Sequence, residues 1–265
     1  MNLNCDNGLY IDDLSSYEHS GSLLGEHYSP SFIKAWCNCP AKIAFSVLCG
    51  SEKADAMKIG SSVHRILESK YSDANTSKVV EEERAACGEL FSSVENYLSS
   101  YNTIEPYDGF DESSDFFTER EIVSEVKPLG VTLPAKLKGF VDRIDIGNNG
   151  VFVVDYKTSS KKPSKNNHTD QLIIYKWLVE ESLGIDVNGC YIASIRKEKS
   201  EYIKSDITLV AQSKLIDKIF ETDEEVRKSI DSGLYTKKPS NLCNFCPARE
   251  YCKNNLKLEG VRFDG

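Results

Sequence analysis

The chain has 265 residues, of which 40% are hydrophobic and 28% are charged, so its composition is that of an ordinary globular protein. No apolar run approaches the ~20 residues that span a bilayer, and the first residues show no secretory signal, so we expect a cytoplasmic protein with no membrane partner. The net charge of −9 argues weakly against nucleic acid as a partner, although basic residues gather between 157 and 165 and between 237 and 253.

The first part of the chain is predicted to be mainly helical. After an irregular head over 1–28, Ser29 and Pro30 supply the N-cap and first position of a short helix that ends near Pro40. Further helices over 51–71 and 77–101 complete a helical lobe, residues 29–104. One of them places His64 beside an apolar stripe, where a lone histidine is usually a boundary residue unless acidic partners lie nearby.

The second part alternates between strands and helices. The predicted strands are 116–125, 137–146, 151–158, 189–195 and 202–208, and the predicted helices are 169–183 and 209–232. Strands flanked by helices predict an α/β or α+β fold with a central mixed sheet. This core covers 105–236, and a cysteine-rich segment, 237–265, follows it.

The hairpin GFVDRIDIGNNGVFVVDYKTSS, residues 139–160, carries charges in strands that otherwise look buried. If its turn centres on Asn148 and Asn149, Asp142 faces Asp155, and Lys157 shares their side of the sheet. Two facing buried carboxylates are destabilising unless something positive neutralises them. Lys157 in a structural ion pair and a divalent cation such as Mg²⁺ satisfy this condition equally well.

Nine cysteines in a reducing compartment indicate metal binding rather than disulfides. The tail residues Cys243, Cys246 and Cys252 form C-x₂-C-x₅-C, a compact metal-binding pattern that lacks a fourth ligand. Cys37 and Cys39, near the end of the first short helix, are both candidates for it. Four thiolates suit structural zinc or an iron–sulfur cluster. The cysteines expected to be small buried hydrophobic residues are Cys5, Cys49, Cys87 and Cys190.

Short motifs follow one another in a characteristic order. They are G-x-x-x-H at 60–64, G-x-x-D-R-I-D at 139–145, D-x-K at 155–157, Q-x-x-x-Y at 171–175 and the C-terminal cysteines. Together, over roughly 29–252, they resemble the RecB-like branch of the PD-(D/E)XK nucleases. The resemblance is closer to the CRISPR-associated and AddB-type exonucleases that carry an iron–sulfur cluster. A chain of this size fits a standalone phage or CRISPR-associated enzyme.

The resemblance implies a restriction-endonuclease-like fold and a role for each matching residue. The implied ligands of Mg²⁺ or Mn²⁺ are His64, Asp142, Asp155 and the backbone carbonyl of Tyr156. Lys157 would position or activate the attacking water and stabilise charge on the phosphate. Gln171 and Tyr175 would support the site and the DNA strand. The family also places an acidic residue on a preceding strand, and Glu119 and Glu121 both fit.

The cysteines receive roles from the same resemblance. The implied ligands of a 4Fe–4S cluster, with structural zinc as the alternative, are Cys39, Cys243, Cys246 and Cys252. Cys39 rather than Cys37 matches the family's first cluster cysteine, because it lies in a segment similar to S-x-S…C-P. The basic residues expected to contact DNA are Lys161, Lys162 and Lys165.

The function implied is a metal-dependent DNA exonuclease that hydrolyses phosphodiester bonds on single strands or duplex ends in recombination, repair or replication. No helicase-type phosphate loop is present in these 265 residues, so we expect a nuclease without a motor of its own. One alternative is a DNA-end-processing or DNA-binding subunit of a CRISPR-adaptation or recombination complex, with recombination or replication proteins as partners. The other is a non-catalytic, metal-stabilised interaction module.

Overall fold

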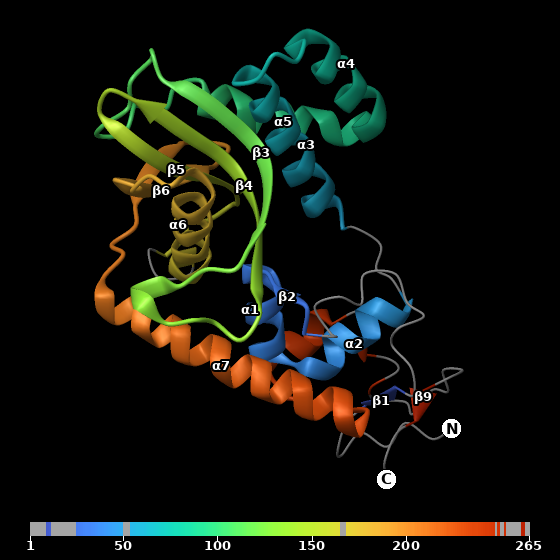
Figure 1. Cartoon of the computed structure of the whole chain (residues 1–265). Coiled ribbons are helices and arrows are strands. Elements are labelled where there is room, and N and C mark those ends of the chain that lie inside the picture. Colours follow the sequence, from blue (N-terminus) through green and yellow to red (C-terminus); the bar gives the residue numbers. More distant parts are fainter. Residues whose placement is uncertain are drawn as a thin grey trace. The chain divides into compact units, whose positions relative to one another are not determined.

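The computed structural model of the protein describes residues 9–11, 25–49, 54–164, 168–246, 248–249, 252 and 261–262. The chain divides into two compact units (Figure 1). Unit 1 contains residues 1–52, 125–138 and 213–265, and unit 2 contains 53–124 and 139–212. The four-segment division made from the sequence stays a prediction. No helix in the described part is long and apolar enough to cross a membrane.

A mixed sheet forms the centre of unit 2, as predicted. Its strands are β3 (Asp115–Ser124), β4 (Lys136–Gly147, from Gly139 on), β5 (Gly150–Thr158), β6 (Gly189–Ile195) and β7 (Glu201–Lys204). β4 pairs with β3 and runs antiparallel to β5, β5 runs parallel to β6, and β6 runs antiparallel to β7. The parallel pairing of β5 with β6 requires a crossover, which the helix between these two strands supplies.

The β4–β5 hairpin has the predicted register, from Arg143 opposite Val154 to Gly147 opposite Gly150. The described pairs stop there, so the direct pairing of Asp142 with Asp155 that this register suggested is not part of the ladder. Instead, the Asp142 carboxylate accepts a hydrogen bond from the backbone N–H of Tyr156 at 2.6 Å. Asp142 thus binds the β5 backbone with one oxygen, and its other oxygen is available for another partner.

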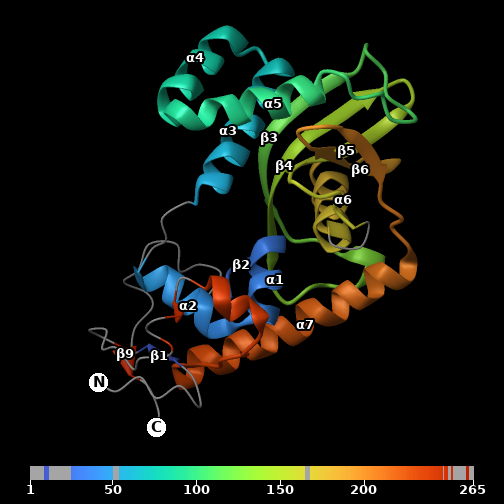
Figure 2. The same ribbon diagram turned by 180° about the vertical axis from the view of Figure 1, so that it is seen from behind.

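Helices cover both faces of this sheet (Figures 1 and 2). α6 (Thr169–Leu183) contacts β3, β5 and β6 on one face, whereas α3 (Asp55–Lys70) and α5 (Phe91–Tyr101) contact β5 and β6 on the other. The second face buries a largely aromatic cluster that includes Tyr101 and Tyr156. Over β5 and β6 both faces of the sheet are therefore covered, which agrees with the apolar residues on both sides of the hairpin sequence, whereas β3 alternates between exposed and half-buried residues.

The single helix predicted over 77–101 is wrong. The chain forms α4 (Thr76–Cys87), a short 3₁₀ turn (Gly88–Leu90) and then α5. Gly88 is the C-cap of α4 and has a φ of +54°, which glycine adopts without steric cost because it has no Cβ. The break allows α4 and α5 each to pack against α3.

Unit 1 is built mainly from helices. They are α1 (Pro30–Asn38), α2 (Pro40–Cys49) and α7 (Leu209–Ser232, from Ser213 on). Ser29 caps α1 as predicted, because its hydroxyl accepts a hydrogen bond from the Phe32 amide at 3.1 Å. α1 ends at Asn38, close to its predicted end near Pro40, but the sequence did not predict α2, which Pro40 begins, since a proline at the first helical position lacks only an N–H that would stay unpaired.

Short strands complete unit 1. β2 (His27–Tyr28) runs parallel to the first residues of β4, and β8 (Leu234–Tyr235), β1 (Leu9–Ile11) and β9 (Val261–Arg262) form a small sheet in that order. The Tyr28 hydroxyl donates to Asp223 at 2.7 Å and the Trp36 indole donates to Glu225 at 2.9 Å. These buried and half-buried hydrogen bonds attach β2 and α1 to α7.

Candidate active site

Side chains that the sequence motifs single out lie together in unit 2. They are His64 on α3, Asp142 on β4, Asp155 and Lys157 on β5, and Gln171 and Tyr175 on α6. Asp155 and Lys157 are two positions apart on one strand and so share a face of the sheet. Gln171 and Tyr175 are one turn apart on the helix that covers this face. Four elements therefore position one polar cluster in an otherwise apolar interior.

Asp155 is the most deeply buried member, with a side chain that is 0% exposed. Its Oδ1 accepts hydrogen bonds from Lys157 Nζ at 2.8 Å and from Gln171 Nε2 at 2.9 Å. Lys157 Nζ also lies 2.7 Å from Oδ2, but without the angles of a hydrogen bond, so Oδ2 is left without a hydrogen-bond partner. Burial raises the pKa of Asp155 to about 6, Lys157 partly offsets this effect, and the Asp142 charge adds to it. A buried carboxylate in this state favours a further cation beside it.

His64 and Asp142 form the second half of the cluster. His64 Nδ1 lies 3.5 Å from Asp142 Oδ1, and potential ligand atoms of His64, Asp142 and Glu119 all lie within 4.8 Å of one another. Burial opposes protonation of His64, but the Asp142 carboxylate outweighs burial and raises its pKa. Desolvation, followed by the charges of Asp142 and Glu68, raises the pKa of Glu119. His64 and Lys157 therefore do not fully neutralise the carboxylates of this cluster.

The structure distinguishes between the two glutamates that the sequence left open. Glu119 on β3 belongs to the trio with His64 and Asp142, whereas Glu121 does not. Glu119 has a φ of +44°, in the left-handed region that costs energy for residues with a Cβ. Strand alternation could not have identified it, because Glu119 and Glu121 are two positions apart and regular pleating gives both the same face. The irregular backbone at Glu119 breaks this equivalence.

These side chains fit a divalent cation. Carboxylate oxygens are the ligands that Mg²⁺ and Mn²⁺ prefer, and a neutral imidazole is a suitable additional ligand for a transition metal such as Mn²⁺. The buried Asp155 Oδ2, which has no hydrogen bond, has the properties expected of a ligand atom. Asp155 lies outside the tight trio of His64, Glu119 and Asp142, so the described cluster is a trio with an adjoining carboxylate.

Gly139 allows α6 to approach β4. A Cβ at this position would lie 2.8 Å from Leu178 Cδ1 and 3.0 Å from Tyr175 Cε1, so a methyl group must displace one of these side chains. We expect Gly139→Ala to cost about 1–3 kcal/mol of stability. It should also lower turnover ~10-fold, because Tyr175 and Gln171 move together through their hydrogen bond. Thermal unfolding and kcat measured on the same preparation test this. Unchanged turnover would show that the position of α6 does not affect catalysis.

The lysines expected to contact DNA have different environments. Lys162 forms an ion pair with Glu201 at 2.6 Å, so its charge is partly neutralised within the protein. Lys161 is exposed. Lys165 lies outside the described residues.

The cysteine-bearing segments both belong to unit 1. Cys39 follows α1 and is half-buried, whereas Cys37 is exposed. Directly after Cys39, the Ala41 amide donates to the Thr236 carbonyl at 3.1 Å, and Trp36 packs edge-on against Tyr235 at 6.1 Å between ring centroids. The chain around Cys39 therefore lies beside the chain that leads into the C-terminal cysteines.

The C-terminal cysteines lie in and after a 3₁₀ turn (Asn241–Phe245). Cys243 Sγ accepts a hydrogen bond from the Ser240 amide at 3.4 Å, and the Cys246 amide donates to the Cys243 carbonyl. Tetrahedral zinc, with bonds of about 2.3 Å, would hold sulfurs about 3.8 Å apart. Among the described residues, no three cysteine sulfurs lie within 4.8 Å of one another. A four-iron cluster spaces its cysteines more widely, because each thiolate binds a different iron.

The remaining cysteines differ in what the structure describes. Cys190 is buried as predicted and Cys87 is half-buried, beside the Ser62 hydroxyl at 3.0 Å. Cys5 and the side chain of Cys49 lie outside the described residues.

Comparisons with known proteins agree with the motifs and the fold. A family model described as the PD-(D/E)XK nuclease superfamily matches residues 27–253. The structure resembles a crystal structure from Eubacterium rectale, of a protein provisionally named an exonuclease, with a TM-score of 0.58 and 15% identity over 93% of this chain and 94% of that chain.

A second solved structure, of the protein SSO0001, aligns at 18% identity over 82% of this chain and 94% of that one, with a TM-score of 0.36 that is too low to indicate a shared fold. The search of curated proteins found no significant match. The likeness to the Eubacterium rectale structure supports the nuclease-like fold, and the family match extends over most of the sequence. This protein therefore belongs to the PD-(D/E)XK nuclease superfamily.

Proposed function

We propose that the protein is an Mg²⁺- or Mn²⁺-dependent DNA exonuclease that acts on single strands or duplex ends. Nucleases of this superfamily use divalent metal ions. The observation that carries the proposal is the buried Asp155, with a raised pKa and an oxygen without a hydrogen bond, beside the trio of His64, Asp142 and Glu119. Such an arrangement is costly for a purely structural site, whereas metal-dependent phosphodiester hydrolysis uses carboxylates of this kind to hold its ion.

The proposed metal ligands are His64, Glu119, Asp142, Asp155 and the backbone carbonyl of Tyr156. A bound divalent ion supplies Lewis acidity and lowers the pKa of a coordinated water. Lys157 keeps its ammonium within reach of Asp155 while its side chain is 25% exposed, so it can also reach a phosphate oxygen. Its role is to orient the attacking water and to neutralise charge that develops on the phosphate.

Gln171 and Tyr175 complete the proposed site from α6. Gln171 uses both N–H groups of its amide, one on Asp155 and one on the Tyr175 hydroxyl. This fixes the orientation of the Asp155 carboxylate. Burial raises the pKa of Tyr175, so its hydroxyl keeps its proton and can donate it to a phosphate oxygen of the DNA strand.

Lys157→Ala is expected to lower kcat by about 10²–10³-fold and to leave Mn²⁺ affinity within a factor of about three, because the lysine acts on the transition state rather than on the metal. Calorimetric titration with Mn²⁺ and single-turnover kinetics measure the two quantities separately. Loss of Mn²⁺ binding together with the lysine would instead support a structural ion pair with Asp155.

The two neighbouring glutamates provide a matched pair of variants. Glu119→Gln is expected to lower Mn²⁺ affinity and cleavage by at least ~10-fold, because Glu119 lies within the trio, whereas Glu121→Gln is expected to change neither. Both substitutions remove one charge from the same strand, so a general electrostatic effect would affect them equally. Equal losses would contradict the assignment of Glu119 as a ligand.

We further propose that Cys39, Cys243, Cys246 and Cys252 hold a 4Fe–4S cluster, with structural zinc as the alternative. The adjacency of the Cys39 region to the strand before the C-terminal cysteines supports a shared site, and the resemblance to cluster-bearing nucleases favours the cluster over zinc. The cluster would cross-link two distant parts of unit 1 and would take no part in hydrolysis.

The decisive experiment is a cleavage assay on anaerobically purified protein with end-labelled single-stranded and duplex DNA, in Mn²⁺, Mg²⁺ and EDTA. Stepwise shortening from one end, in metal only, supports the exonuclease. Cleavage that appears only after addition of recombination or CRISPR-adaptation proteins would indicate a subunit of a larger complex. No cleavage under any of these conditions would contradict the proposed activity and leave the non-catalytic interaction module.

A further inference from the structure

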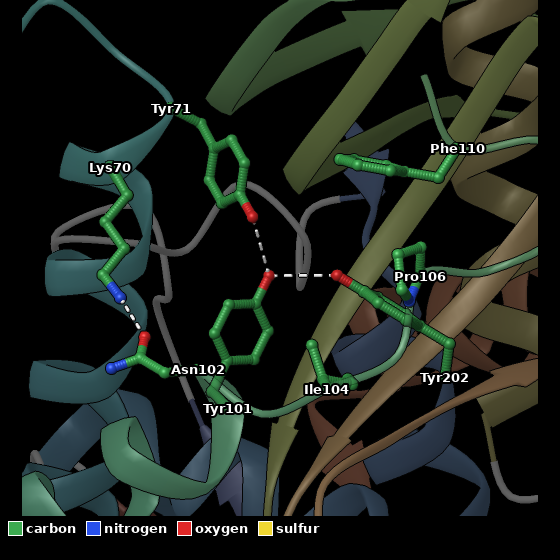
Figure 3. A pocket seen from close by; sticks show the side chains of 8 residues that line it. All are labelled: Lys70, Tyr71, Tyr101, Asn102, Ile104, Pro106, Phe110 and Tyr202. Carbon is green, nitrogen blue, oxygen red and sulfur yellow. Dashed lines mark hydrogen bonds between the residues drawn. The ribbon is translucent and has the colours of Figure 1, made fainter. Parts of the chain in front are cut away.

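Unit 2 contains a cavity of about 360 Å³ that the proposed chemistry does not use. Figure 3 shows side chains from α3, α5, the following loop and β7 around it. The residues that matter are Lys70, Tyr71, Tyr101, Asn102, Phe110 and Tyr202. The volume lies in the range of small-molecule sites, which combine apolar or aromatic walls with a few polar groups.

Three tyrosine hydroxyls meet at this cavity. The Tyr101 hydroxyl lies 3.1 Å from that of Tyr71 and 3.0 Å from that of Tyr202 (Figure 3). Burial raises the pKa of Tyr101 and Tyr202, so both keep their protons at neutral pH. The chain of three hydroxyls therefore has three protons but only two hydrogen bonds between its members.

One of the three hydroxyl protons has no acceptor within the group, and Arg143 cannot accept it. All five of its N–H groups are used: two bind the Asp145 carboxylate, and three donate to the hydroxyls of Tyr101, Tyr156 and Tyr202. Arginine only donates, so it cannot accept a hydroxyl proton. If the Tyr156 hydroxyl is added to this group of hydroxyls, it brings one more proton and can form at most one more hydrogen bond within the group. One O–H therefore remains without an acceptor among the described residues.

Lys70 adds a positive charge at the same cavity. Its ammonium donates to Asn102 Oδ1 at 2.6 Å and lies 5.9 Å from the centre of the Tyr101 ring. Burial lowers the pKa of Lys70. Within the described part of the chain, Lys70 forms no ion pair with a carboxylate, so its charge is not neutralised by the protein. The cavity thus offers donors and a positive charge, and its ligand must supply acceptors and a negative charge.

The cavity also lies close to the proposed metal site. Lys70 follows His64 by six residues on α3, a rise of ~9 Å. The Tyr156 ring packs edge-on against the rings of both His64, at 5.7 Å, and Tyr101, at 5.9 Å. A strand whose phosphate lies at the metal site can therefore reach the cavity within a few nucleotides.

We propose that this cavity binds one nucleotide, with its base against the tyrosine and phenylalanine rings and its phosphate on Lys70. The surplus tyrosine proton is donated to an acceptor of the base, such as a ring carbonyl. Aromatic walls stack on any base, so the site holds a nucleotide with little sequence preference. The inference rests on the proposed DNA substrate, and the nucleotide can be either one unit of the DNA strand or a free mononucleotide.

The test uses the Asp155→Asn variant in EDTA, so that binding is measured without cleavage. Calorimetry compares thymidine 5′-monophosphate, thymidine and inorganic phosphate, and fluorescence anisotropy measures binding of a labelled oligothymidylate. Lys70→Met in the same background is expected to weaken binding by about 5–10-fold, Lys70→Arg should restore it, and Phe110→Leu should weaken it by removing an aromatic wall. Lys78→Met, which removes an exposed lysine of α4, is the matched control and should change nothing.

The outcomes distinguish a free mononucleotide from a unit of the DNA strand as the ligand of the cavity. Mononucleotide binding that Lys70→Met weakens supports the site with a free nucleotide as its ligand. If Lys70→Met weakens binding of the oligonucleotide but not of the mononucleotide, the site is supported with one unit of the DNA strand as its ligand. The proposal is overturned if Lys70→Met changes neither, or if phosphate binds as tightly as the nucleotide. Cleavage by the wild-type protein is measured separately, so a failure of the nuclease activity leaves this result interpretable.

Discussion

Replacing Asp155 by asparagine is expected to reduce DNA cleavage by at least ~10³-fold and, at the same time, to make the metal-free protein more stable above pH 6. The loss of activity follows from removing a proposed metal ligand and the partner of Lys157. The gain in stability follows from burial, since the carboxylate is 0% exposed and only partly neutralised. Asparagine fills the same volume without the charge.

The pH dependence has a definite sign. The pKa of Asp155 is raised from 3.8 to about 6 in the folded protein. Below pH ~4 the group is protonated in both the folded and unfolded states and costs nothing, whereas the folded state is progressively penalised as the pH rises to ~6. A shift of about two units corresponds to about 3 kcal/mol as an upper value, and the unpaired Lys157 of the variant reduces the gain.

The measurement is thermal unfolding of wild-type and Asp155→Asn protein in EDTA at pH 4 and pH 7.5. We expect an increase in Tm of roughly 5 °C at pH 7.5 and almost none at pH 4. Asp73→Asn, at an exposed aspartate, is the control and should shift neither value. Asp142→Ala should lose cleavage in the same way. A variant at either position that keeps wild-type turnover in Mg²⁺ would contradict the proposed site.

Local sequence rules predicted the elements around this site well. The helix 169–183 and the strand 189–195 have the predicted bounds. The helix is apolar around most of its circumference, and it ends before Gly184, which adopts the left-handed conformation that ends helices. The errors occur where one residue has two interpretations. Pro40 lies just after the end of α1 and also begins α2, which the sequence did not predict, and Gly88 breaks a helix whose apolar pattern continues beyond it.

The site was predictable as a set of residues but not as a geometry. Hairpin register placed Asp142 and Asp155 on one face, yet it could not show that Asp142 binds the Tyr156 amide where the ladder stops. The choice of Glu119 depends on a positive φ, which no propensity of glutamate predicts. Tertiary packing decides both features.

The cysteines lead to the second large effect. Wild-type protein purified without oxygen is expected to be brown, with absorbance near ~400 nm and with iron and sulfide rather than zinc. A link from Cys39 to Cys243 closes a loop of about 200 residues, and by analogy with a disulfide this stabilises the folded state by about 5 kcal/mol. Cys39→Ser and Cys246→Ser should therefore lose colour and stability together.

Cys37→Ser is the discriminating variant, because Cys37 is two residues from Cys39 and exposed whereas Cys39 is half-buried. It should stay brown and keep its stability, as should Cys87→Ser in unit 2. Absorbance, iron content and thermal unfolding of the same preparations measure this. A colourless Cys37→Ser beside a brown Cys39→Ser would exchange the two assignments. A colourless wild-type protein with one zinc would replace the cluster by zinc and leave the proposed nuclease site intact, since every residue of that site lies in unit 2.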